Sequence, residues 1–225
     1  MSSQASTLSR VGRLWAAPIG KKAVMAITGV VLYGFAFVHM AGNLQFFLGR
    51  IRFDAYGAGI KATPALLWGV RTLLFVSLVL HVITAVQLTA LKRSARPQAY
   101  KRTATVAGSY ASKTMFYGGL VLLAFLIFHI LHFTTGNAHP NFVEGAAYDN
   151  VINGFAVVPV AVFYIVAMLA LSMHLYHGVW SVFQSLGLNH PRYTPRLKLF
   201  AKLFAVVVTA GFITIPVAVL AGVAA

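Results

Sequence analysis

Five long runs of uncharged residues constrain the fold of this chain more than any other feature. An α-helix rises 1.5 Å per residue, so about 20 such residues cross a hydrocarbon core of about 30 Å. The runs are continuous and do not alternate in short pieces, which excludes a transmembrane barrel. We predict an all-α polytopic membrane protein, a single domain over residues 1–225 with five transmembrane helices. The predicted spans are roughly 23–47, 66–91, 114–135, 155–186 and 199–221.

The composition excludes several classes of protein. Of the 225 residues 59% are hydrophobic and 9% are charged, with a mean hydropathy of +0.80, which is too apolar for a soluble domain. No Asp or Glu lies within a predicted span, so a carboxylate relay of the kind found in pumps has no residues to use. The chain has no cysteine, which excludes Cys-ligated iron–sulfur clusters, covalent CxxCH haem and disulfides.

The distribution of charge predicts the orientation. With the N-terminus in the cytoplasm, the outer segments hold four cations and all three acids, Asp54, Glu144 and Asp149. The inner segments then hold fourteen cations: Arg10, Arg13, Lys21, Lys22, Lys92, Arg93, Arg96, Lys101, Arg102, Lys113, Arg192, Arg196, Lys198 and Lys202. This bias follows the positive-inside rule. We predict a multi-pass protein of the cytoplasmic (inner) membrane, with its N-terminus inside and its C-terminus outside.

The net charge of +15 is explained by the same bias, and we do not expect nucleic-acid binding. A basic inner face could also dock an acidic soluble partner, which charge alone does not decide. In the first twenty residues, Leu8, Val11, Leu14 and Trp15 could share one face of a short helix on the inner interface. The segment is also rich in Ser and Arg and lacks acids, so a transit peptide is the alternative.

The connections predict how the spans are arranged. Residues 48–65 are rich in glycine and are predicted as a short outer loop that ends at Pro64. Residues 92–113 form a basic inner loop, and 136–154 form a second outer loop. The fourth span is longer than a bilayer requires, so we expect it to tilt or to project into the cytoplasm. The fifth span has no histidine and is expected to pack against the outside of the bundle.

Four spans carry histidine, and the depths of these residues can be compared. At 1.5 Å per residue, His39 and His129 lie about 24–25 Å above the inner edge. His81 and His177 lie about 15–16 Å above it, on helices that run in the opposite direction. An ionisable residue inside the membrane is costly without a partner and usually marks function. The sequence thus predicts an outer pair, His39 with His129, and an inner pair, His81 with His177.

Two facing histidines in an apolar bundle suit a six-coordinate haem, in which no position is left open for oxygen. We therefore predict two haems b and electron transfer. Isolated histidines that hydrogen-bond between helices are the alternative, and the matching depths on four helices weigh against it. Each HxxH motif leaves a choice open, because His132 and His174 each lie three residues from the preferred ligand. We interpret these two as alternative ligands or as partners of haem propionates or a quinone.

Smaller features have weaker interpretations. Arg71 lies at the outer end of the second span, where it could contact haem propionates or simply reach the interface. Ser77, Thr84 and Ala85 share a face with His81, and Gly42 shares one with His39. Small residues of this kind make room for a flat macrocycle, but they also let helices approach closely. His139 and His190 lie in connections and are expected to be solvated.

Several motifs, in order, resemble one membrane protein family. IGKKAVMAITG, FVHMAGNLQFF, RTLLFVSLVLHVITAVQLT, ARPQAY, SYASKTMFYGG, FLIFHILHF and MHLYHGVWSVFQSLG are similar to segments of cytochrome b subunits of succinate:quinone oxidoreductases. The similarity is to the single-chain, five-helix, two-haem type of this complex II anchor. It covers nearly the whole chain apart from the first fifteen residues and the fifth helix. The resemblance implies His39 with His129 at a distal haem and His81 with His177 at a proximal one.

The resemblance also implies partners and a role. It implies a flavoprotein subunit and an iron–sulfur subunit on the cytoplasmic side, with this chain passing electrons to a membrane quinone, either menaquinone or ubiquinone. Relatives that reduce fumarate can carry a glutamate two residues before the HG histidine, where this chain has Leu175. This difference favours succinate oxidation. Trp180, Ser181 and Gln184 are candidates near the quinone only because they are polar or aromatic at the inner face.

Other functions stay open at this point. The same role in a quinol:fumarate reductase, or in another quinone-linked dehydrogenase or a hydrogenase, would keep the haems and change the partners. A haem-free anchor would use the histidines structurally. The lack of acids in the spans makes a transporter the weakest alternative.

Overall fold

The structure, a computed structural model, describes residues 12, 15, 17–94 and 110–223, with the backbone alone for 110–113. Across these residues the chain is helical and contains no strand. The long helices are α2 (Pro18–Asn43, extended by the 3₁₀ turn η1, Leu44–Leu48), α4 (Pro64–Ser94), α5 (Tyr110–Phe133), α7 (Val158–Ser185) and α8 (Thr194–Leu220). Most of the predicted interfacial or transit segment, and the basic loop around Lys101, lie outside the described residues.

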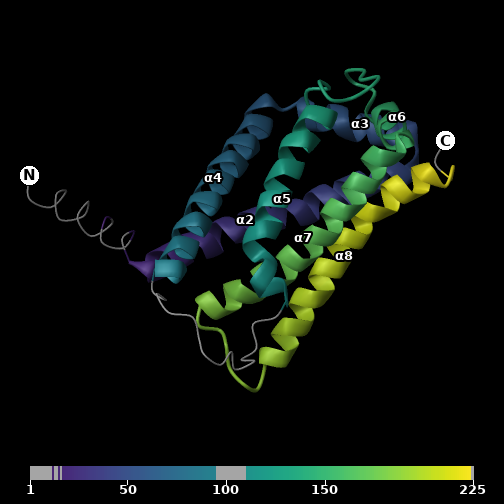
Figure 1. Cartoon of the computed structure of the whole chain (residues 1–225). Coiled ribbons are helices and arrows are strands. Elements are labelled where there is room, and N and C mark those ends of the chain that lie inside the picture. The colour runs from purple at the N-terminus through teal and green to yellow at the C-terminus, as the bar shows by residue number, and fades with distance from the viewer. Residues whose placement is uncertain (1–11, 13–14, 16, 95–109, 224–225) are drawn as a thin grey trace, which may run out of the picture.

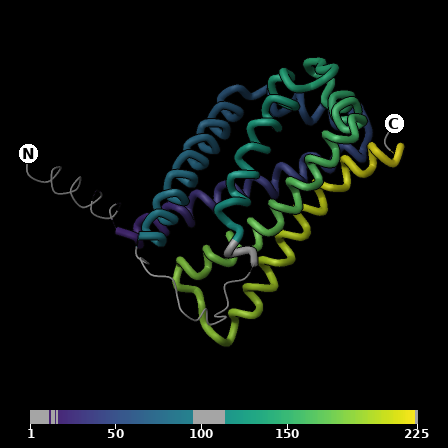
Figure 2. The backbone as a smooth tube through the Cα atoms, viewed as in Figure 1, coloured from purple at the N-terminus to yellow at the C-terminus, as the bar shows by residue number. Residues whose placement is uncertain are grey.

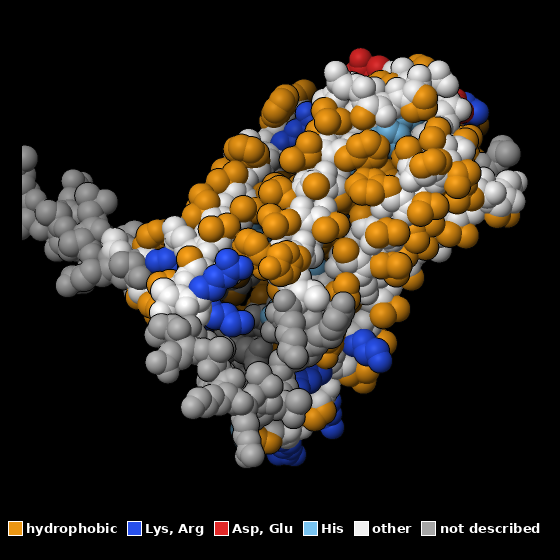
Figure 3. All heavy atoms as spheres, in the orientation of Figure 1, with side chains coloured by type: hydrophobic (Ala, Val, Ile, Leu, Met, Phe, Trp, Pro, Cys, Tyr) orange, Lys and Arg blue, Asp and Glu red, His pale blue; other side chains and the backbone are white. Residues whose placement is uncertain are grey.

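The prediction of an all-α, multi-pass membrane protein is confirmed. Five helices are long and apolar enough to cross a bilayer, and each matches one predicted span within a few residues, apart from the earlier start of the first and fifth. Pro18, Pro159 and Pro195 stand in the first turns of α2, α7 and α8, where a missing backbone N–H costs nothing. The sides of these helices are covered with apolar side chains, and Lys and Arg gather toward their ends (Figure 3).

The prediction of a loop at residues 48–65 is wrong, because this segment contains helix α3 (Arg50–Lys61). Gly49, with a φ of 88°, turns the chain sharply between η1 and α3, a conformation that favours glycine. Phe53 of α3 is buried against Phe46 of η1, with ring centroids 5.8 Å apart. Tertiary packing of this aromatic pair outweighs the low helix propensity of the glycines that follow it.

The predicted fourth span, 155–186, is divided in the structure. A short helix, α6 (Ala147–Ala156), ends before Val157, whose backbone is extended, and α7 begins at Val158. The break follows from Pro159, which has no N–H to donate to the carbonyl of Phe155 and whose ring would clash with that carbonyl in a continuous helix. Residues 147–156 therefore lie across the outer end of the bundle and do not extend the span.

The four histidine-bearing helices form an incomplete ring, seen in Figure 1 and Figure 2. Helix α2 packs against α4 and α7, and α7 packs against α5, whereas α4 and α5 do not pack closely against each other. Helix α8 lies outside this ring against α7 and α2, as predicted for the fifth span. Few residues of α4 and α5 are buried among the described side chains: Ser77 and Thr84 on α4, and His132 on α5.

Helices α3 and α6 meet at the end of the bundle that was predicted to lie outside (Figure 1). All three acidic residues of the chain form contacts between α3 and α6 or the segments beside these helices. Arg50 forms an ion pair with Asp149, Lys61 lies 3.6 Å from Glu144, and the backbone N–H of Tyr148 donates to Asp54 at 2.8 Å. These contacts fasten the two connecting segments into one cap, which we call the outer cap (residues 44–61 and 136–156).

Candidate functional site: paired histidines within the bundle

The predicted outer pair lies together in the structure. The rings of His39 on α2 and His129 on α5 lie near each other, with centroids 5.9 Å apart and ring planes at 79°. Both side chains are partly buried. Phe35 stacks against His39 and Phe125 against His129, so the pair lies in apolar, aromatic surroundings.

The inner pair differs in one partner from the predicted one. The ring of His81 on α4 lies 6.3 Å from that of His174 on α7, measured between centroids, and no ring contact joins His81 to His177 among the described residues. His177 is half-buried one turn further along α7. Counting residues from a loop measures depth along each helix axis and ignores tilt, so it separates two histidines one turn apart only weakly. The choice between His174 and His177 stays a prediction.

The two pairs bridge helices that do not pack against each other. His39 and His129 connect α2 with α5, and His81 and His174 connect α4 with α7, across the two diagonals of the ring. The close helix contacts run around the ring and not across it. The two histidine pairs thus join helices that lie across the ring from each other.

Two glycines make room beside the inner histidines. A Cβ added at Gly29 of α2 would lie 3.6 Å from Cε1 of His81, and one at Gly119 of α5 would lie 3.8 Å from Cε1 of His174. These are ordinary contact distances, so the histidine rings lie directly over the glycine backbones. The sequence analysis did not single out either glycine, and only the packing of neighbouring helices reveals them.

A hydroxyl from another helix contacts one histidine of each pair. Oγ1 of Thr28 on α2 lies 3.1 Å from Nδ1 of His81. The hydroxyl of Tyr164 on α7 lies 3.4 Å from Nδ1 of His129 and 3.1 Å from Nδ1 of His132. Thr28 and Tyr164 are buried, at 5% and 6% exposure. Sequence analysis missed both, because a lone Thr or Tyr in an apolar helix gives no signal of its partner.

His139 is buried, not solvated as predicted. Its Nε2 lies 2.8 Å from the carbonyl oxygen of Asn150, and its Nδ1 accepts from the backbone N–H of Asn141. Its ring stacks on His132, with centroids 4.8 Å apart, inside the outer cap. The prediction failed because helix α6 covers the connection after α5, and this helix was not predicted. His190 is exposed, as expected.

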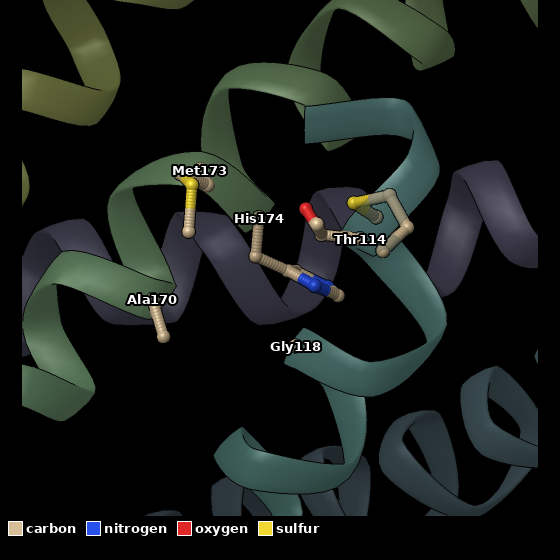
Figure 4. Close-up of a pocket in the computed structure, with 6 residues that line it drawn as sticks. Thr114, Gly118, Ala170, Met173 and His174 are labelled. Carbon is tan, nitrogen blue, oxygen red and sulfur yellow. The ribbon is translucent and has the colours of Figure 1, made fainter. Parts of the chain in front are cut away.

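Within the described part of the chain, two buried histidine nitrogens have no hydrogen-bond partner: Nδ1 of His174 and Nε2 of His132. Figure 4 shows His174 projecting from α7 toward α5, where it lines a small pocket with Thr114, Gly118 and Ala170. Burying a nitrogen without a hydrogen-bond partner destabilises the folded state by about 1–3 kcal/mol. Such atoms are therefore rare in native folds and often mark a site where another group binds. His174 and His132 are the HxxH partners of the preferred ligands.

The remaining predicted residues lie around the pairs. Arg71 is exposed, and its guanidinium lies over the ring of Trp68 at 5.1 Å, which is consistent with an interfacial position. Ser77 and Thr84 are buried on α4, and Thr84 donates to the carbonyl of Leu80. Gly42 is buried on α2 beside Tyr56 of α3, so its small size serves the contact with the outer cap.

At the inner end, Lys198 lies 5.2 Å above the ring of Trp180, Ser181 is half-buried and Gln184 is exposed. Leu175 is buried in an apolar cluster with Met40 and with Ala205 and Val208 of α8. Its side chain therefore packs on the side of α7 that faces α8.

No group of three or more His, Asp or Glu side chains that could hold a metal ion is present in the described part of the chain. The histidines that face each other across the ring do so two at a time. Comparison with known proteins gave no match to a family model, to a curated protein or to a solved structure.

Proposed function

We propose that this chain is the di-haem cytochrome b membrane anchor of a succinate:quinone oxidoreductase. In this proposal the outer haem b is held by His39 and His129, and the inner one by His81 with an α7 histidine, for which His177 is the predicted ligand and His174 the alternative. A flavoprotein subunit and an iron–sulfur subunit would dock on the cytoplasmic side. A membrane quinone, menaquinone or ubiquinone, would accept the electrons.

One observation carries the haem proposal: each diagonal of the helix ring is bridged by two imidazoles at a separation that fits one metal atom between them. With metal–nitrogen bonds of about 2 Å and ring centres about 1 Å behind the nitrogens, two axial imidazoles have centroids about 6 Å apart. The observed separations are 5.9 Å for His39 and His129 and 6.3 Å for His81 and His174, the alternative inner ligand. Structural histidines have no need to face each other at this spacing on both diagonals.

The surroundings of the histidines support the same proposal. Gly29 and Gly119 leave flat backbone beside the inner histidines, as a macrocycle requires. Nδ1 of His174 is buried and has no hydrogen-bond partner among the described residues, so this nitrogen is available to a bound group. Helices α4 and α5 do not pack closely against each other, so a group bound between the histidine pairs would not have to separate two packed helices there. The residues present therefore fit a haem.

A bis-histidine haem supplies one-electron transfer, and its two protein ligands leave no position for oxygen. The chain's own residues do the rest. The four imidazoles fix two redox positions at different depths, with about 9 Å between the predicted layers from six residues of helical rise. Apolar side chains such as Phe35 and Phe125 keep water away from them. The dicarboxylate chemistry belongs to the partner subunits.

The number of haems tests the proposal. The purified chain should contain two haems b by pyridine haemochromogen assay, both low-spin. His39→Leu should lose the outer haem while succinate still reduces the inner one, and His81→Leu should lose the inner haem and block reduction of the outer one by succinate. His190→Leu, in an exposed connection, is the control and should keep both. Spectra after succinate and after dithionite separate these results.

One haem or none in the parent chain would overturn the di-haem proposal. Succinate reduction that survives His81→Leu but not His39→Leu would reverse the assigned order. Copurification with hydrogenase or formate dehydrogenase subunits, in place of a flavoprotein with a dicarboxylate site, would keep the cytochrome and change the complex. The direction, succinate oxidation or fumarate reduction, would be read from the activity of the isolated complex.

A further inference from the structure

The hydrogen bond between Thr28 and His81 determines which nitrogen of His81 carries its proton. The single hydroxyl proton of Thr28 is directed to the carbonyl oxygen of Val24, four residues earlier on α2, at 2.7 Å. With its proton used in this way, Oγ1 of Thr28 offers a lone pair at its 3.1 Å contact with His81, and Nδ1 of His81 is then the donor. The neutral imidazole is therefore protonated on Nδ1, and Nε2 keeps the lone pair that a metal binds.

The same reasoning applies to Tyr164, which has two histidines and one proton to share. If the hydroxyl accepts from Nδ1 of His129, it donates to Nδ1 of His132; the opposite arrangement reverses both roles. In either of these two arrangements, only one of the two neutral histidines offers Nε2 as a ligand. His129 is the one that faces a histidine of another helix, whereas the ring of His132 stacks on His139.

We propose that Thr28 and Tyr164 are positioning residues for the two haem layers. Each hydroxyl, held by a neighbouring helix, accepts the Nδ1 proton of one histidine and so presents that histidine's Nε2 to the centre of the ring. Thr28 acts on His81 in the inner layer, and Tyr164 acts on His129 in the outer layer. This inference rests on the proposed function, because it takes His81 and His129 as axial ligands.

The sign of the effect follows from the hydrogen bond. A partner that accepts the Nδ1 proton makes the imidazole more basic and a stronger ligand, which favours the oxidised, more positive metal. Removing the hydroxyl should therefore favour the reduced form of that layer alone. Outer-shell partners of metal-ligating histidines are typically worth 10–100-fold in metal affinity, and we expect about tenfold in the reduction equilibrium. For a one-electron couple tenfold corresponds to about 59 mV.

Thr28→Val and Tyr164→Phe keep the shape of each side chain and remove only the hydroxyl. In the complex with two haems, Thr28→Val should raise the midpoint potential of the inner haem and leave the outer one unchanged. Tyr164→Phe should raise the midpoint potential of the outer haem and leave that of the inner haem unchanged. Redox titration followed by optical spectra, with electron paramagnetic resonance of the oxidised haems, measures both. Thr28→Ser restores a hydroxyl and should restore the parent potentials.

Matched controls are available on the same fold. Thr209→Val removes a buried hydroxyl on α8 that donates in the same way to a carbonyl four residues earlier, that of Ala205, and forms no hydrogen bond with a histidine among the described residues. Tyr176→Phe removes a second tyrosine hydroxyl from α7. Neither should move a potential.

Two haems whose potentials are unchanged in Thr28→Val and Tyr164→Phe would overturn this inference and leave the proposed function standing. Equal shifts in the control variants would also overturn it, because they would show a general structural effect. A chain that binds no haem would overturn the proposed function and this inference together.

Discussion

Histidines three residues apart on one helix have different surroundings in this chain. On α5, His129 faces another helix's histidine, whereas His132 is fully buried beneath the outer cap. On α7, His174 faces His81 and lies beside Gly119, whereas His177 lies one turn closer to the inner end. Each HxxH motif therefore places two imidazoles one turn apart on the same side of a helix. This one-turn difference determines which of the two imidazoles lies near the histidine of another helix.

The α7 ligand can be assigned by paired substitutions. Depth predicts that His177→Leu removes the inner haem, because leucine cannot bind a metal, and that His174→Leu retains it. Haem content and the optical spectrum of each purified variant give the answer. Loss of the inner haem in His174→Leu alone would assign the ligand to His174, the histidine whose ring lies near His81.

Gly154 tests how tightly the buried histidines of the outer cap are packed. A Cβ at this position would lie 2.8 Å from Cε1 of His132 and 3.0 Å from Nε2 of His139, closer than side chains tolerate. We expect Gly154→Ala to destabilise the protein by about 1–3 kcal/mol through overpacking. The thermal midpoint of the purified protein in detergent measures this.

Gly34→Ala is the control, because a Cβ there meets nothing within 4 Å on helix α2. It should leave the midpoint unchanged or raise it slightly, since alanine is the better helix former. If Gly154→Ala unfolds at the same temperature as the parent, the two rings are not held against this backbone.

Helix α6 illustrates how one element depends on another. Its N-cap residue, Ala146, makes no side-chain hydrogen bond, and the carboxylate of Asp54 on α3 accepts from the N–H of Tyr148 instead. A carboxylate at this position also interacts favourably with the positive end of the helix dipole. A cap that a local side chain usually provides thus comes from a residue far away in sequence.

Replacing Asp54 by Ala should loosen the outer cap. Loss of a helix cap costs about 0.5–2 kcal/mol, and the first turn of α6 should exchange its amide hydrogens faster. Hydrogen exchange followed by mass spectrometry can resolve this region. Glu144→Gln is the matched control, because its ion pair with Lys61 is exposed on both sides and contributes little. Equal protection of α6 in both variants would exclude Asp54 as its cap.

The extent to which elements could be predicted depends on what determines them. Runs of apolar residues determined the five spans, because the bilayer sets their length. Helices α3 and α6 were not predicted, because their apolar residues pack on one another, as Phe46 does on Phe53, and show no long period. Thr28 and Tyr164 were missed because their partners are far away along the chain. His81 lies 53 residues from Thr28, and His129 lies 35 residues from Tyr164.

At the scale of the whole molecule, the described charges separate between the two ends. The acids and the outer cap lie at one end, and Lys92, Arg93 and Lys198 lie on helix ends at the other. This separation agrees with the fourteen-to-four bias counted from the sequence. It leaves the cation-rich end as the surface for soluble partners in the proposed complex.

Topology reporters test this orientation. Fusions at Lys101, in the basic connection, and at Ala225, the last residue of the chain, should give opposite signals. An alkaline phosphatase fusion should be active at Ala225 and inactive at Lys101, and a fluorescent protein that matures only in the cytoplasm should do the reverse. The same signal at both positions would contradict five spans.

The incomplete ring has a consequence for how the protein is assembled. Helix α4 packs mainly against α2, the preceding long helix, and contacts α7 where the ring of His81 lies near that of His174. The first two spans can therefore enter the lipid as a hairpin before the others dock on them. Because α4 and α5 do not pack closely against each other, the proposed haem could enter the ring between these two helices after they have inserted. In such a protein, the chain would need its prosthetic group to complete its architecture.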